Sequence, residues 1–191
     1  MKKTIALVLC VFLVLPSLSA LAATRDFGMI RINEVMASNG ETLDDSYGKS
    51  CDWIELRNMS DDDIDMSGLN LSDGKKNLAK FTFPEGVVLP KGGYMIIFCS
   101  DYEKVETLAD GTTEIHVPFK LSSEGEKVVI SYQDVILDIV RFDRQTKDVS
   151  YALKDDGTWA YCETPTPGAE AGSEGGHSRA SLPDRRRRSR R

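Results

Sequence analysis

From Met29 onward the sequence consists of short apolar runs separated by clusters of Gly, Pro, Asn, Asp and Ser. Runs of this length that are rich in β-branched and aromatic residues indicate strands, and the clusters between them indicate turns. No long helical period competes with this pattern. The runs predict about nine strands and a short tenth, at residues 29–36, 52–58, 68–72, 80–83, 94–99, 115–121, 127–132, 135–142, 150–154 and 158–161.

Alternation within these runs places one face of each strand in a core. In the run 135–142, for example, Asp138, Val140 and Phe142 share one parity. Only Gln133 and Asp134 separate this run from the preceding one, which predicts an antiparallel hairpin. Short strands without intervening helices favour two packed antiparallel sheets, so the expected fold class is all-β, an immunoglobulin-like sandwich. A jelly roll or a partly open barrel fits the same spacing.

Residues 1–22 have the pattern of a secretory signal peptide. Lys2 and Lys3 precede an apolar run, and a small-residue cleavage site ends at Ala22. The run is shorter than the roughly 18 to 20 residues that a membrane-spanning helix needs. We therefore expect export, a mature chain that begins near Ala23, a secreted or cell-surface location, and no transmembrane segment.

Charge is divided unevenly between the expected domain, residues 23–168, and the tail, residues 169–191. The domain has 15 basic and 27 acidic residues, a net charge of −12, whereas the tail has seven arginines against three acidic residues. An acidic domain repels nucleic acid and anionic membranes. Its expected partners are cations, basic proteins or neutral polymers such as glycans, and no nucleic acid is expected for the core domain.

The tail is rich in Gly and Ser and then in Arg, and it lacks the apolar residues that a fold needs. This composition predicts disorder. One hypothesis is that the tail binds anionic wall polymer, nucleic acid or the domain's own acidic face. The other is that it results from a truncated or shifted reading frame, in which case the chain is a fragment of a larger multidomain surface protein.

Export removes Cys10 and leaves Cys51, Cys99 and Cys162. An odd number of cysteines permits at most one internal disulfide, and the spacing leaves its pairing open. The spacing is also unlike that of a zinc site.

Two carboxylates fall within otherwise apolar strands. Glu34 shares the parity of Ile32, and Glu55 shares that of Trp53, which we expect to pack between the sheets. A buried carboxylate needs partners because desolvating an unpaired charge is costly. The favoured interpretation is that both accept hydrogen bonds from backbone, Ser or Asn groups. The alternative is an acid and base pair in a carboxylate-dependent extracellular hydrolase.

Asp61, Asp63 and Asp65 are spaced as at the start of an EF-hand calcium loop. The match then fails, because Met66 stands at the glycine position and Ser72 at the bidentate glutamate position. A solvated turn is the favoured interpretation. A weak calcium site at the three aspartates, in a calcium-dependent adhesion module, is the alternative, and no other cofactor is expected.

Catalytic nucleophile motifs are absent from the sequence. A Ser-His-Asp arrangement would need His116, since His177 falls in the tail, and no Gly-x-Ser-x-Gly turn presents a serine. We therefore interpret His116 as an ordinary strand residue and expect no enzyme activity and no catalytic residues.

The sequence contains six recognisable blocks in order: residues 30–35 (IRINEV), 52–58 (DWIELRN), 65–73 (DMSGLNLSD), 90–94 (PKGGY), 119–126 (FKLSSEGE) and 164–168 (TPTPG). In these blocks and their order, the chain resembles the lamin tail domain family over about 140 residues. The resemblance implies an immunoglobulin-like sandwich and, in bacterial secreted members, a surface or accessory module. The chain has no heptad rod, so filament roles are not implied. We expect a non-catalytic binding or scaffold module whose loops or exposed sheet edge engage a protein or glycan at the cell surface.

Overall fold

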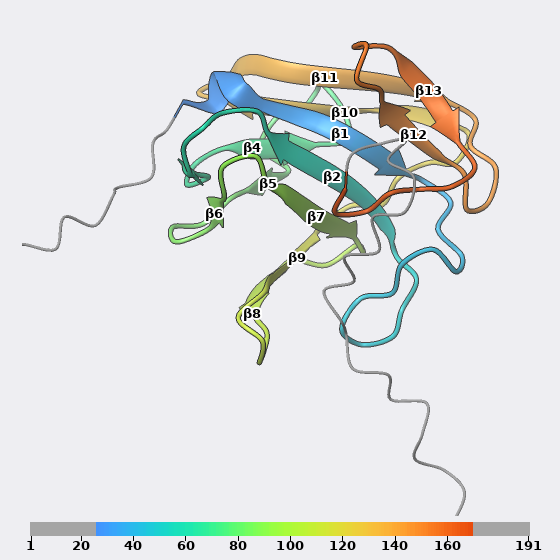
Figure 1. Ribbon diagram of the computed structural model, residues 1–191, viewed down its shortest axis with the longest axis horizontal. Coiled ribbons are helices and arrows are strands. Elements are labelled where there is room, and N and C mark those ends of the chain that lie inside the picture. Colours follow the sequence, from blue (N-terminus) through green and yellow to red (C-terminus); the bar gives the residue numbers. More distant parts are fainter. Residues whose placement is uncertain (1–25, 170–191) are drawn as a thin grey trace, which may run out of the picture.

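The computed structural model describes residues 26–169, which form two packed β-sheets and a small two-stranded one (Figure 1). The large sheet has the order β13-β12-β1-β2-β7-β9-β8, the second sheet has the order β11-β10-β4-β5, and β3 pairs with β6. A turn of 3-10 helix, η1 (Phe27–Met29), precedes the first strand. The strands are β1 (Ile30–Met36), β2 (Asp52–Asn58), β3 (Ile64–Asp65), β4 (Asn70–Ser72), β5 (Phe81–Thr82), β6 (Val88–Leu89), β7 (Tyr94–Cys99), β8 (Lys104–Thr107), β9 (Thr113–Val117), β10 (Gly125–Tyr132), β11 (Val135–Asp143), β12 (Ser150–Leu153) and β13 (Trp159–Cys162).

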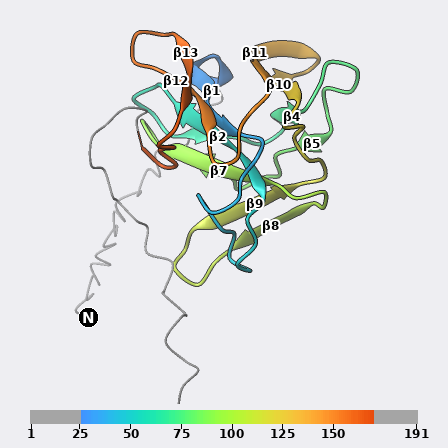
Figure 2. The same ribbon diagram turned by 90° about the vertical axis from the view of Figure 1, so that its right-hand side faces the viewer.

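The predicted all-β, immunoglobulin-like sandwich is confirmed, although it contains more strands than the sequence pattern indicates. Figure 2 separates the two layers, with β4, β5, β10 and β11 on one side and β12, β13, β1 and β2 on the other. The unpredicted strands are β3, β6 and β8. Strands β3 and β6 have two residues each, too few to show alternation, and β8 has Val105 as its only apolar residue. The predicted signal peptide, residues 1–22, and the tail after Ala169, for which disorder is predicted, lie outside the described residues.

One strand pair corrects the expectation of purely antiparallel sheets. Strands β7 and β9 are parallel, with Ile97 opposite Ile115 and Cys99 opposite Val117. The chain leaves β7, runs back along the sheet edge as β8 and returns between them as β9. The position of β8 at the edge therefore explains the parallel pair. Strand β9 also ends earlier than predicted, because Pro118 has no backbone N–H to continue the ladder.

The main core lies between the two sheets. Ile32 and Leu56 of the large sheet and Val128 and Ile130 of the second sheet are fully buried members of one apolar cluster. Trp53 is also fully buried, as predicted, but it belongs to a separate cluster with Met36 and Phe98. Its neighbours Ile54 and Leu56 point into the main core, and side chains alternate along a strand. Trp53 thus packs on the outer face of the large sheet, and its predicted place between the sheets is wrong.

The predicted hairpin joins β10 and β11, with Tyr132 opposite Val135. Gln133 and Asp134 both have positive φ, 48° and 64°. This is the backbone of a type I′ turn, whose twist matches that of the flanking strands.

The three cysteines of the described part are free thiols. Cys99 packs in the main core, whereas Cys51 packs against the Trp53 cluster on the opposite face of the sheet. Burial raises the pKa of both thiols, most strongly that of Cys99. Within residues 26–169, no helix has the length and apolar character to cross a membrane.

Candidate functional site

Strand β1 contains a β-bulge at Asn33 that moves Glu34 to the outer face of the large sheet. Ile32 pairs with Leu56 and Glu34 pairs with Glu55, so Asn33 is the extra residue between two registered pairs. Side chains after the bulge alternate in the opposite sense from those before it. The parity that the sequence suggested for Glu34 is therefore wrong, and its carboxylate lies beside that of Glu55.

The two carboxylates bind the same short segment of the chain, residues 166–168. Glu34 Oε1 accepts a hydrogen bond from the hydroxyl of Ser150. Glu34 Oε2 accepts from the backbone N–H and from the hydroxyl of Thr166, each at 3.2 Å. Glu55 accepts one from Asn33 Nδ2 at 2.7 Å and one from the backbone N–H of Gly168. We call Glu34 and Glu55 the carboxylate clamp.

Both clamp side chains are completely buried, at 0% exposure. Burial raises the pKa of Glu55 to about 8, against the opposing effect of the hydrogen bonds from Gly168 and Asn33, and the nearby Glu34 charge adds to the rise. Burial also raises the pKa of Glu34, which the hydrogen bonds from Ser150 and Thr166 oppose. The clamp is therefore a pair of desolvated acids whose oxygens face protein donors.

This geometry confirms that the carboxylates are held by backbone, Ser and Asn donors, as the favoured interpretation states. It gives no support to a hydrolase that uses Glu34 and Glu55. A glycosidase needs its two carboxyl groups on either side of a substrate that reaches them. Here both are closed off by residues 166–168 and have no exposed surface.

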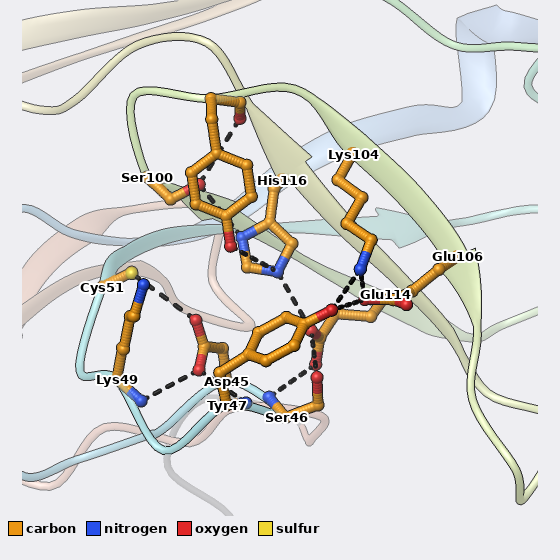
Figure 3. Close-up of polar contacts among 11 residues, drawn as sticks. Asp45, Ser46, Tyr47, Lys49, Cys51, Ser100, Lys104, Glu106, Glu114 and His116 are labelled. Carbon is orange, nitrogen blue, oxygen red and sulfur yellow. Dashed lines mark hydrogen bonds and ion pairs between the residues drawn. The ribbon is translucent and has the colours of Figure 1, made fainter.

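His116 of β9 forms the centre of a second buried polar cluster (Figure 3). Its side chain is 0% exposed and its ring stacks against Phe98 and Tyr102, with centroids 5.4 and 4.7 Å away. Nδ1 lies 3.0 Å from Ser100 Oγ, and Nε2 lies 3.0 Å from Glu114 Oε1. His116 therefore connects several buried side chains, and the interpretation of it as an ordinary strand residue is wrong. The sequence contained one signal for this: Glu114 and His116 are two positions apart, and residues two apart on a strand point to the same face.

Glu114 connects this cluster to the loop of residues 44–50, which we call the Tyr47 loop. One Glu114 oxygen accepts from the Ser46 backbone N–H at 2.9 Å and the other from the Ser46 hydroxyl at 2.7 Å. Asp45, only 2% exposed, accepts from the backbone N–H groups of Tyr47 and Lys49, both at 2.9 Å. Such local turns fix a loop without a strand ladder. The loop is therefore held by Glu114 at Ser46 and by Asp45 at Tyr47 and Lys49.

The Tyr47 loop presents an exposed aromatic ring next to the edge strand β8. Tyr47 is 52% exposed, and its hydroxyl donates to Glu106 Oε1 at 2.6 Å. Lys104 Nζ contacts the Tyr47 hydroxyl, lies 4.8 Å from the ring centroid, and pairs with Glu106 at 2.8 Å. The hydrogen bond from Lys104 lowers the pKa of Glu106, so the two groups keep opposite charges. We call Tyr47, Lys104 and Glu106 the Tyr47 surface.

The chain of Ser100, His116 and Glu114 has the composition of a catalytic relay, in which a carboxylate and an imidazole polarise a hydroxyl. A relay also needs space for a substrate beside the hydroxyl. Ser100 lines neither of the cavities of about 270 and 500 Å³ that border β10, β11 and the loop after β4. The hydrogen bonds from Ser46 to Glu114 indicate instead that the His116 cluster fixes the Tyr47 loop.

The three aspartates of the suggested calcium site have separate contacts. Asp63 accepts a hydrogen bond from the Lys91 backbone N–H at 2.9 Å, Asp65 accepts one from the Ser67 N–H at 3.0 Å, and Asp61 is exposed. In the part of the chain that the structure describes, no group of three or more His, Cys, Asp or Glu side chains is placed to hold a metal ion. The calcium site stays the untested alternative to a solvated turn.

Comparison with protein-family models gives a match to the lamin tail domain over residues 23–157. The matched part contains β1 to β12, the Tyr47 loop and both clamp residues, whereas residues 164–168 lie beyond it. A comparison with curated proteins gives no match.

Proposed function

Since the chain belongs to the lamin tail domain family, we propose that it is a secreted binding module that engages a protein or glycan at the cell surface. Domains of this family are immunoglobulin-like and typically act as non-catalytic protein-interaction modules. Export is supported by the signal-peptide pattern of residues 1–22. The carboxylate clamp and His116 already have hydrogen-bond partners within the protein. They are therefore accounted for by internal contacts, which favours a binding role over a catalytic one.

The Tyr47 surface is the observation that carries this proposal. Tyrosine is enriched at binding hot spots because it offers a large, rigid and amphipathic contact at a small entropic cost. Tyr47 is half exposed, and its loop is already fixed by Asp45 and Glu114. A partner that covers Tyr47 would not have to order this loop first, so little conformational entropy would be lost on binding.

Strand β8 adds a second contact element beside Tyr47. It is the last strand of the large sheet, so one of its edges has no strand partner within residues 26–169. An edge of this kind offers backbone N–H and C=O groups to an added strand. Lys104 and Glu106 of β8 contact Tyr47, so the ring and the edge form one continuous surface.

The proposal is tested by capture of the purified protein on cell-surface material, with a charge-matched acidic protein as the reference. We expect enrichment over that reference, and at least a tenfold loss of capture for Tyr47→Ala. Tyr161→Ala is the matched control, because Tyr161 is a similarly exposed tyrosine, at 45%, on the opposite edge of the sheet. Equal capture of the protein and the acidic reference would contradict the proposal.

A further inference from the structure

A lysine-lined groove lies on the second sheet, away from the Tyr47 surface. It has a volume of about 500 Å³ and is lined by the β4–β5 loop and by the first residues of β10. Its lining contains four lysines against two carboxylates, although the domain as a whole has a net charge of −12. We call it the lysine groove. The residues concerned are Lys75, Lys76, Lys80, Lys127, Asp73 and Glu126.

Most of the cations at the groove are not neutralised by the protein. Lys80 pairs with Asp73 at 2.5 Å. Within the described residues, by contrast, Lys75, Lys76 and Lys127 have no carboxylate within 4.0 Å. In a chain with so many acidic residues, three unpaired lysines around one groove leave a local positive potential.

A fifth cation increases this potential at a cost to folding. Arg141 of β11 is the registered cross-strand partner of Lys127 in β10, and it lines the adjoining cavity of about 270 Å³ together with Glu124, Glu126 and Asp143. Like charges directly opposite each other destabilise a sheet. Arg141 also has no carboxylate within 4.0 Å among residues 26–169. An external anion would remove this repulsion.

The loop that carries Lys75 and Lys76 is fixed by a buried hydroxyl. Ser72 is 0% exposed, donates to the backbone carbonyl oxygens of Asn77 at 2.6 Å and Gly74 at 2.9 Å, and accepts from the Gly74 N–H. The Lys80–Asp73 pair closes the base of the same loop. The two exposed lysines are therefore presented on a preorganised loop, which reduces the entropy lost on binding.

The lining identifies the class of ligand. Every residue that borders the groove is polar, charged or glycine. Protein partners are usually anchored by apolar or aromatic side chains in pockets, and none is offered here. Single-stranded nucleic acids need aromatic platforms for base stacking, which the lining also lacks. A hydrophilic polymer with repeated negative charges fits best.

We infer that the lysine groove, together with Arg141, binds an acidic glycopolymer through its repeated carboxylate or phosphate groups. Two of the four carboxylates that line the groove and the adjoining cavity are already paired, Asp73 with Lys80 and Glu124 with Arg144. Acidic residues more than about 8 Å away are largely screened at physiological ionic strength. The net charge had suggested cations, basic proteins or neutral glycans as partners, and the groove is a local exception. It is separate from the Tyr47 surface, so either site can fail its test independently of the other.

The test is an affinity measurement with polygalacturonate as the carboxylate polymer, teichoic acid as the phosphate polymer, and dextran as the neutral polymer. The tail would bind polyanions by itself, so all proteins are full-length chains in which the seven tail arginines are changed to Gln. These are Arg179, Arg185, Arg186, Arg187, Arg188, Arg190 and Arg191. We expect binding to at least one acidic polymer, no binding to dextran, and an affinity that falls as salt rises.

The triple variant Lys75→Glu, Lys76→Glu and Lys127→Glu should lose at least tenfold in affinity for the acidic polymer. The control Lys91→Glu, Lys120→Glu and Lys147→Glu makes the same change in net charge at exposed lysines outside the groove, and it should lose less than threefold. Circular dichroism checks that both variants are folded. Equal losses in the two variants, no binding to either acidic polymer, or equally tight binding to duplex DNA would overturn the inference.

Discussion

Glu34 and Glu55 are cross-strand partners on β1 and β2, and both of their carboxylates hold residues 166–168. Two buried acids side by side are normally unfavourable, because each carboxylate opposes ionisation of the other. Here the donors Ser150, Asn33 and the backbone N–H of Gly168 offset part of this cost. The clamp ties the end of the domain to its two central strands.

The raised pKa of Glu55 predicts that stability depends on pH. Its folded-state value of about 8 exceeds the ordinary value of 4.5, so the folded state holds its proton more tightly than the unfolded state. The associated stability is fully present below the unfolded value and is lost as pH rises through about 8. The free energy of unfolding should fall between about pH 5 and pH 8, with a slope of at most about 1.4 kcal/mol per pH unit for one group.

Urea unfolding at several pH values measures this slope. Glu55→Gln should flatten it, whereas Glu85→Gln, a change at an exposed glutamate, should leave it as it is. An unchanged slope in Glu55→Gln would show that Glu55 does not titrate in this range.

The β10–β11 hairpin can be stabilised at its turn. Gln133 and Asp134 both adopt positive φ, where Asn and Gly are favoured. The double change Gln133→Asn and Asp134→Gly should raise the free energy of unfolding by about 0.5 to 1 kcal/mol. Thermal unfolding measures the gain, and the control Asp156→Asn, Gly157→Ala should not reproduce it, because Gly157 has a φ of 80°. A lower melting temperature for the Asn-Gly hairpin would rule out a type I′ turn.

Trp53 should contribute to stability through its volume rather than its polar group. Its ring is fully buried, and its indole N–H has no hydrogen-bond partner among the described residues. Trp53→Ala should cost about 3 to 5 kcal/mol. Trp53→Phe should cost less than about 2 kcal/mol, because it keeps an aromatic ring and removes the unpaired donor. Equal losses for the two variants, measured by urea unfolding, would contradict this account of the Trp53 cluster.

Calcium at millimolar concentration should leave the melting temperature unchanged. Asp63 and Asp65 already accept backbone hydrogen bonds, so neither carboxylate is free of contacts. A ligand selective for the folded state would raise the melting temperature. A rise that disappears in Asp61→Asn, Asp63→Asn would instead establish the calcium site suggested by the sequence.

The sequence was sufficient for the fold class because alternation is visible in any strand of about five or more residues. Strand β11 and the hairpin before it follow directly from the alternating run and the two-residue turn. Alternation does not show an extra residue, so the bulge at Asn33 reversed the expected direction of Glu34. Alternation also does not show which face of a sheet is covered by a loop. For this reason the sequence placed Trp53 between the two sheets, whereas it packs on the outer face of the large sheet.

Site residues were harder to predict because their partners are distant in sequence. Glu34 is linked to Thr166 over 132 positions, and Ser46 to Glu114 over 68. The pair Glu114 and His116 was visible as two polar residues on one strand face, but the Tyr47 loop that they fix has no motif of its own. The lysine groove depends on the registered pair of Lys127 and Arg141 and on the β4–β5 loop, which only the fold brings together.

The proposed binding function is tested most directly by measuring cell-surface affinity and unfolding free energy together for Tyr47→Ala and Glu55→Gln. We predict that Tyr47→Ala loses at least tenfold in affinity with little change in stability, since Tyr47 is half exposed. Glu55→Gln should change the pH dependence of stability and keep the affinity of the unchanged protein. Unchanged binding by Tyr47→Ala, or binding lost only in Glu55→Gln while the protein stays folded, would contradict the account.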